Sequence, residues 1–178
     1  LKNVVSIHIV AVENEVKELL WEIKKSFSDS PKIIAVNLEK QQIVSTSIEL
    51  SKNYQATYSL PKKYLYEPNA SLLKSGGFEA VSELFALDKL HQHSHLYTAD
   101  EIKDFQGRRF EITQEIPFQK NDLKKYIQNQ KMNVTTRNFP LKVEDIKKKY
   151  KISDGGTLFA FFTTNLKNEK IVLLCTKI

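Results

Sequence analysis

The chain has 178 residues, 41% of them hydrophobic and 27% charged, which supplies enough apolar side chains for one core or for two small adjoining ones. Its lone cysteine, Cys175, excludes an internal disulfide and a zinc site with paired cysteines, and no apolar run approaches the roughly 20 residues of a membrane span. The net charge of +6 is uneven, because residues 1–100 hold 11 Lys and Arg against 12 Asp and Glu, while residues 101–178 hold 16 against 9.

The first 50 residues predict a strand, a helix and a hairpin. Residues 6–12 form a dense apolar run that is typical of a strand buried on both faces. From Glu13 to Phe27 the apolar side chains recur at helical spacing, with glutamates early and lysines late, which indicates a helix. Two β-branched runs, 32–38 and 42–50, flank the polar Glu39-Lys40-Gln41 and predict a hairpin. This order is half of a ferredoxin-like unit.

The next stretch predicts short elements. Residues 64–70 suit an extended segment, after which Pro68 can open a helix that Gly76-Gly77 closes. A second short helix is expected at 79–87, and residues 91–100 are expected to be a connector with a short strand. We place a domain boundary near Asp100, where the charge changes sign.

The basic C-terminal part predicts alternating strands and helices. Strands are expected at 108–116, 132–137, 157–164 and 170–177, and helices at 121–129 and 143–150. The whole chain is therefore expected to be α+β. We expect a ferredoxin-like segment at 1–60, a helical connector at 61–100 and a basic domain at 101–178 with a mixed sheet.

The sequence predicts no catalytic or metal centre within this chain. The turn at Val12-Glu13-Asn14-Glu15 lacks the glycines that a nucleotide or S-adenosylmethionine (SAM) cofactor requires after a first strand. Gly155-Gly156 precedes a strand and suits a tight turn. His91, His93 and His95 alternate, but no neighbouring carboxylate or cysteine supports a metal site. Cys175 lies in an apolar strand with no histidine near it in sequence, so it is expected to be core.

Basic and aromatic residues are the remaining candidate site. A positive charge gathered on one domain favours a polyanionic partner, and arginine forks grip phosphates while aromatic faces stack on bases. Solvated lysines around an aromatic core are the alternative explanation. The candidate RNA contacts, with Arg137 beside Asn138 preferred, are Arg108, Arg109, Lys124, Lys125, Lys131, Arg137, Asn138, Lys142, Lys147 and Lys148.

Several motifs resemble one protein family along nearly the whole chain. They include Val10 to Glu15, Tyr64 to Ala70, His95 to Thr98 and Val134 to Leu141. Together they resemble the C-terminal region of bacterial, Bacteroidetes-type THUMP-like class I SAM-dependent methyltransferases. Where that family usually has cysteine after Asn-Glu, this chain has Val16.

The resemblance implies a ferredoxin-like segment followed by a THUMP-like domain that captures and orients structured RNA, such as tRNA or rRNA. It implies that the chain, which starts at Leu1 rather than Met, is a piece of a longer cytoplasmic enzyme. SAM and the catalytic residues would then belong to an N-terminal methyltransferase domain of the parent protein, and this fragment would hold no cofactor. Tyr66, Glu67 and Asn69 are candidates for docking on that domain. The alternative is a structural or dimerising domain without RNA.

Overall fold

The computed structural model describes residues 1–40 and 42–178, in which the chain forms two compact units. The first comprises residues 1–56, 68–86 and 104–107, and the second comprises residues 57–67, 87–103 and 108–178. These boundaries differ from those expected near residues 60 and 100. The reason is that the expected connector is divided between the units, with residues 61–67 and 87–100 in the second and residues 68–86 in the first.

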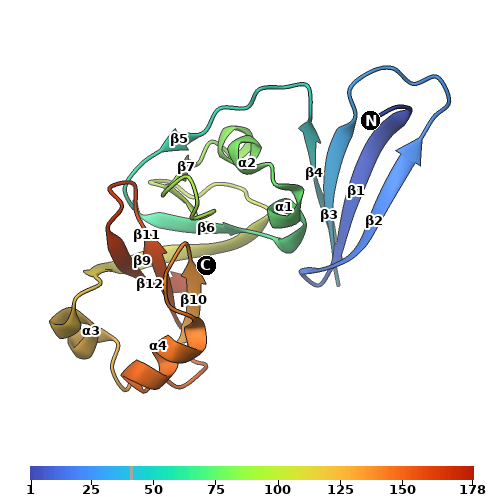
Figure 1. Ribbon diagram of the computed structural model, residues 1–178. Coiled ribbons are helices and arrows are strands. Elements are labelled where there is room, and N and C mark those ends of the chain that lie inside the picture. The colour runs from blue at the N-terminus through green and yellow to red at the C-terminus, as the bar shows by residue number, and fades with distance from the viewer. Residues whose placement is uncertain (41) are drawn as a thin grey trace. The chain divides into compact units, whose positions relative to one another are not determined.

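The first unit is built on a four-stranded sheet with the order β2-β1-β3-β4, in which β1 and β3 are parallel (Figure 1). The strands are β1 (Val4–Val12), β2 (Glu15–Ile23), β3 (Lys32–Glu39) and β4 (Gln42–Glu49). The predicted first strand and the hairpin are confirmed. Gln41, which belongs to the predicted hairpin turn, lies outside the described residues.

The predicted helix from Glu13 to Phe27 is wrong, because most of this segment is the edge strand β2. Its residues pair antiparallel with β1, from Ile23 opposite Val4 to Glu15 opposite Val12. Glu13 and Asn14 make the turn with φ of 48° and 63°, the positive values of a tight hairpin turn of the I′ type. Cross-strand pairing therefore outweighs the helix propensity of its leucines, glutamates and lysines.

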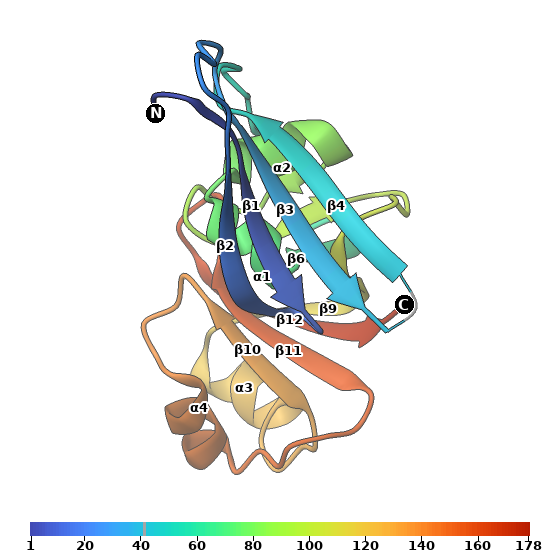
Figure 2. The same ribbon diagram turned by 90° about the vertical axis from the view of Figure 1, so that its right-hand side faces the viewer.

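Two short helices cover one face of this sheet. They are α1 (Ala70–Ser75) and α2 (Phe78–Phe85), close to the predicted positions. The Asn69 side chain accepts a hydrogen bond from the Leu72 N–H and caps α1, and Gly76 ends the helix with φ of 71°. Figure 2 shows the sheet face-on with both helices behind it. Among the described residues of this unit, no element covers the opposite face of the sheet.

The second unit contains an eight-stranded mixed sheet with the order β10-β11-β12-β9-β6-β8-β7-β5. Residues 107–177 confirm the predicted alternation of strands and helices. Its elements are β5 (Thr57–Tyr58), β6 (Tyr64–Pro68), β7 (Asp88–Lys89), β8 (Tyr97–Ala99), β9 (Gly107–Pro117), α3 (Lys120–Tyr126), β10 (Asn133–Arg137), α4 (Val143–Tyr150), β11 (Leu158–Thr164) and β12 (Lys170–Lys177).

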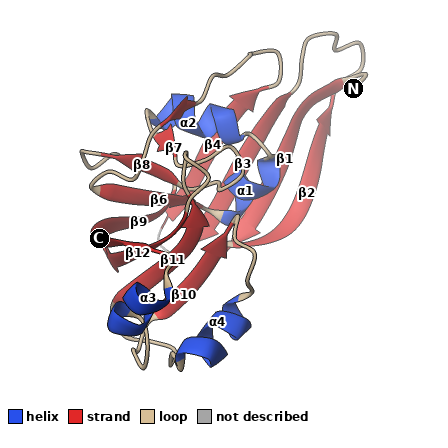
Figure 3. Cartoon of the chain, turned by 60° about the vertical axis from the view of Figure 1, so that its left-hand side comes forward, coloured by secondary structure: helices blue, strands red, loops and turns tan. Residues whose placement is uncertain are grey.

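Strands β11 and β12 are buried on both faces, which explains their continuous apolar sequences. Phe162 and Leu174 face a core that α3 and α4 cover, whereas Phe161 and Leu173 face a second core on the other side of the sheet. Both helices lie on the same side of the strands (Figure 3). No helix among the described residues is long and apolar enough to cross a membrane.

Candidate nucleic-acid interface

A buried carboxylate joins two of the predicted RNA-binding arginines. Glu67, at the end of β6, is 3% exposed and accepts hydrogen bonds from Arg108 Nε at 2.6 Å and from Arg137 Nη2 at 2.8 Å. Arg108 Nη2 also contacts the same carboxylate. From the sequence, Glu67 was predicted to dock on a catalytic domain, whereas Arg108 and Arg137 were predicted to contact RNA. The fold brings all three into one ion cluster.

This cluster limits what the two arginines can offer to RNA. Their side chains are 39% and 36% exposed, so part of each arginine still faces solvent. Glu67 engages Nε and Nη2 of Arg108 and Nη2 of Arg137, whereas Arg137 Nε is buried without a hydrogen-bond partner among the described residues. Arg109 does not join the cluster, and its carbonyl accepts the N–H of Ile178. Arg108 and Arg137 therefore have a structural role, because both hold strand ends together through Glu67.

Asn138 belongs to a neighbouring polar network around His91. The Asn138 side-chain amide lies 3.0 Å from His91 Nδ1, and the His93 N–H donates to the same atom at 3.1 Å. His91 Nε2 lies 3.0 Å from Asn168 Oδ1. Because the His93 N–H donates to Nδ1, that nitrogen is the acceptor and Nε2 is the nitrogen that donates to Asn168 Oδ1. Both ring nitrogens are thus occupied, and no group of three metal-ligating side chains occurs in the described residues.

Tyr66 and Asn69, the other residues predicted to dock on a catalytic domain, are buried as well. Tyr66 is 0% exposed, and its hydroxyl donates to the Glu101 carbonyl and accepts from the Lys103 N–H. Asn69 is 5% exposed and caps α1. The polar motif around Glu67 is therefore explained by bonds inside the fold, which leave little of it for a partner.

Helices α3 and α4 carry the largest group of predicted lysine contacts. Each helix buries an apolar stripe, with Leu123 and Ile146 in the shared core, so the charged positions point outward. The predicted contacts that are exposed on or beside these helices are Lys124, Lys125, Lys131, Lys142 and Lys148.

The predicted lysines differ in how they are engaged. Lys147 is the exception on these helices, because it is half-buried and pairs with Asp154 at 2.5 Å. Lys125 lies over the Tyr126 ring at 4.6 Å, and Lys131 packs along the turn formed by Gly155 and Gly156. The other three, Lys124, Lys142 and Lys148, are exposed, which is the state that a phosphate contact requires.

A cavity lies where the two helices approach each other. It has a volume of about 430 Å³. Lysines reach it from both helices, and its lining is Phe118, Lys120, Leu123, Lys124, Gln128, Lys149 and Tyr150. Lys120 and Lys149 were not predicted as contacts. Their signal in the sequence is helical spacing, since Lys120 and Lys124 are four residues apart and share one face of α3.

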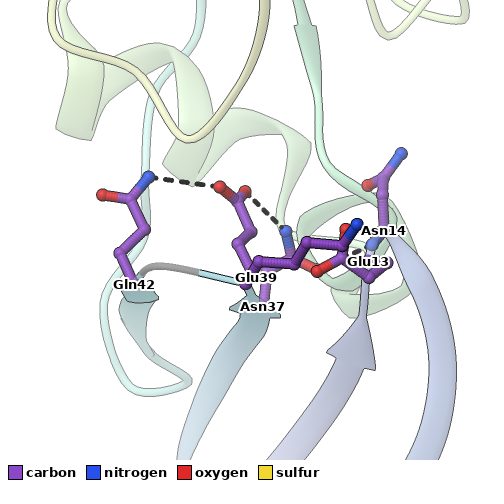
Figure 4. Close-up of a pocket in the computed structure, with 6 residues that line it drawn as sticks. Glu13, Asn14, Asn37, Glu39 and Gln42 are labelled. Atoms are coloured by element: carbon purple, nitrogen blue, oxygen red, sulfur yellow. Dashed lines mark hydrogen bonds between the residues drawn. The ribbon is translucent and has the colours of Figure 1, made fainter.

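The first unit contains a polar pocket lined by Glu13, Asn14, Asn37, Glu39, Lys40 and Gln42 (Figure 4). It lies where parallel strands β1 and β3 end, the position at which open α/β sheets bind nucleotides. Here, however, the Glu13 N–H donates to the Leu38 carbonyl and the Asn14 N–H donates to Asn37 Oδ1. Glu39 accepts from Asn37 and Gln42. These engaged amides and the hairpin turn do not fit a SAM site.

Comparisons with known proteins agree with this architecture. Residues 107–177 match a family described as THUMP domain-like, and residues 64–105 match a ferredoxin-like domain family. The latter range overlaps the expected connector at 61–100, extends to residue 105, and follows the 1–60 segment for which a ferredoxin-like fold was expected. The chain therefore contains ferredoxin-like and THUMP-like domains in an α+β fold.

One solved structure matches nearly all of the chain. It is described as that of a "putative methyltransferase from Porphyromonas gingivalis W83", with 34% sequence identity and a TM-score of 0.88. The match covers 98% of this chain and 46% of that protein, so this chain spans less than half of its relative's length. A search of curated proteins gave no match.

Proposed function

We propose that this chain is the RNA-binding, substrate-positioning region of a cytoplasmic SAM-dependent RNA methyltransferase, whose catalytic domain is not among these residues. The observation that carries the proposal is the lysine-rich surface of α3 and α4 within the segment that matches the THUMP domain-like family. The basic charge of residues 101–178 supports it, because a polyanion gains affinity from each phosphate that lysine neutralises. The similarity to a methyltransferase-like protein supports the parent activity.

In this role the chain would bind and orient the RNA before the methyl-transfer step. Lysines on α3 and α4 would attract and hold the RNA backbone, while the Arg108–Glu67–Arg137 cluster would keep the ends of β6, β9 and β10 in fixed positions. SAM would bind to the absent catalytic domain, since the pocket at the β1 and β3 ends does not fit it. Structured RNA, such as tRNA or rRNA, is the expected ligand class.

Binding to a structured tRNA and to an rRNA fragment at 50 and 200 mM salt tests the proposal. A protein that contacts several phosphates loses affinity steeply over this range. The charge variant K124E/K148E should weaken binding further, whereas K17E, on β2 of the other unit, should change it little. An affinity that is unaffected by both salt and K124E/K148E would contradict RNA capture through this surface.

A specific observation favours the alternative of a docking or dimerising domain. The edge strand β2 exposes large apolar side chains to an unusual extent, with Leu19 at 51%, Leu20 at 52%, Trp21 at 47% and Ile23 at 69%. Apolar edge strands of this kind mark protein interfaces. The double variant L20K/W21K should abolish association with a separately expressed methyltransferase domain, or dimerisation, while leaving RNA binding intact. The two functions use different elements, so both tests can be positive.

A further inference from the structure

The cavity between α3 and α4 differs from the surrounding lysine surface in its charge. Lys120, Lys124 and Lys149 converge on it, and no carboxylate is among its lining residues. Within the described part of the chain these three lysines form no ion pair, in contrast to Lys147, which Asp154 neutralises. Three cationic side chains that line one cavity without a paired carboxylate make its surroundings positive, and such surroundings favour a bound anion.

The helical geometry explains why the cavity stays positive. Lys120 and Lys124 lie four residues apart on one face of α3, whereas Asp122 lies on another face of the same helix. On α4 the acidic residues Glu144 and Asp145 occupy the first turn, and Lys149 belongs to the last. Asp145 lies four residues before Lys149 on α4, yet no carboxylate of either helix is among the residues that line the cavity.

The other lining groups define what kind of anion would fit. Leu123 and Tyr150 are buried at 1% and 6% exposure, and half-buried Phe118 adds a further apolar wall. Gln128 contributes an amide that can both donate and accept hydrogen bonds. A volume of about 430 Å³ exceeds what a phosphate alone needs and lies within the range of small-ligand pockets.

From these features we infer that the cavity is a discrete subsite for one nucleotide of the bound RNA. The lysines hold its phosphate, Gln128 contacts a polar edge, and the apolar wall supports the rest of the nucleotide. The inference rests on the proposed RNA binding and sharpens it, because a discrete subsite makes the cavity lysines unequal to their neighbours. Lysine acts on a phosphate as a compact point charge, which suits convergence from two helices.

Two matched double variants separate a subsite from a diffuse charged surface. K124Q/K149Q removes two cavity lysines, and K125Q/K148Q removes the adjacent lysines on the same two helices, which do not line the cavity. Both remove the same charge and keep most of the side-chain stem. We expect K124Q/K149Q to weaken RNA binding about tenfold more than its control and to lower the slope of log affinity against log salt by about 1.5, as two lost phosphate contacts predict. Equal losses would overturn the subsite and leave RNA binding standing.

A titration with adenosine monophosphate tests the cavity without RNA. In NMR spectra of the full chain, the side-chain amide of Gln128 and the methyl groups of Leu123 should shift saturably with the nucleotide. They should not shift with adenosine, which lacks the phosphate, or in K124Q/K149Q. Shifts without any RNA binding would support a nucleotide site and overturn the proposed RNA function. No shift in the cavity, with RNA bound normally, would overturn the subsite alone.

Discussion

Replacing Glu67 by glutamine should destabilise the second unit, because one buried carboxylate holds two strand ends through Arg108 and Arg137. The variant keeps the volume of the side chain but removes the charge from a group that is 3% exposed. Hydrogen bonds to charged groups contribute about 1.5–3 kcal/mol each. One of the two bonds, at 2.6 and 2.8 Å, can be retained by the glutamine carbonyl, whereas its NH₂ faces the other guanidinium.

The expected loss is about 2–3 kcal/mol of the free energy of unfolding, since both arginines regain part of their hydration from solvent. This corresponds to a decrease of about 5–10 °C in Tm for a chain of this size, measured by circular dichroism. Glu111→Gln is the matched control, because Glu111 is 43% exposed and lies 3.7 Å from Lys63. Its effect should stay within about 0.5 kcal/mol.

Removing the arginines should show that the buried Glu67 carboxylate depends on their positive charge. R108M/R137M leaves a buried carboxylate without a counter-charge and should cost about 3–5 kcal/mol, and adding Glu67→Gln should recover part of that loss. A Glu67→Gln variant as stable as the wild type, or an arginine pair whose removal is not rescued, would refute the assignment of this cluster as a structural tie.

Three further predictions concern other parts of the fold. Burial alone would raise the pKa of Asp88, but the hydrogen bonds from Lys62, Thr57 and Ser59 together with the Lys62 charge outweigh it and lower the pKa below the ordinary 3.8. The ionised Asp88 therefore stabilises the folded chain fully above pH 3.8, and this stabilisation is lost as pH falls through the lowered pKa. In urea titrations, Asp88→Asn should be less stable than the wild type at pH 7 and should show a flatter decline in stability below pH 4. Burial raises the pKa of the Cys175 thiol, so iodoacetamide at pH 8 should label it only after unfolding; rapid native labelling would contradict its place in the core. Asn14 has φ of 63°, and its side chain accepts a hydrogen bond from the Ala70 N–H at 2.7 Å. In thermal melts Asn14→Gly should lose about 1 kcal/mol with this hydrogen bond, and Asn14→Ala should lose about 1 kcal/mol more because alanine disfavours positive φ. Equal losses for the two variants would contradict the turn assignment.

The sequence predicted most of the C-terminal half because its elements follow local rules. The strands around Phe162 and Leu174 show continuous apolar runs, and α4 shows a clear apolar stripe between charged turns. The short strands β5 and β7 were missed because two residues carry no periodicity.

The segment from Glu15 to Ile23 was predicted wrongly for a physical reason. An edge strand with apolar side chains on both faces lacks the alternation that identifies a half-buried strand, and its spacing happens to match a helix. The signal that could have corrected the prediction is Asn14, a residue that favours positive φ and that ends a dense strand run.

The candidate site was predicted in composition but not in arrangement. The charge of residues 101–178 pointed to the lysines of α3 and α4, yet the sequence did not show that Glu67 occupies the arginines. Glu67 is separated from Arg108 by 41 positions in the sequence and from Arg137 by 70, and no local pattern indicates contacts over such separations. Lys120 and Lys149 were missed because only the approach of two helices makes them line one cavity.

Ultraviolet crosslinking of the chain to structured RNA, followed by mass spectrometry of the crosslinked peptides, tests the central claim most directly. The account predicts crosslinks concentrated on peptides from α3 and α4, including Phe118 and the residues around Lys124 and Lys149, and their loss at high salt. Crosslinks confined to β2 and its neighbours, or none at low salt, would contradict RNA capture by the THUMP-like region.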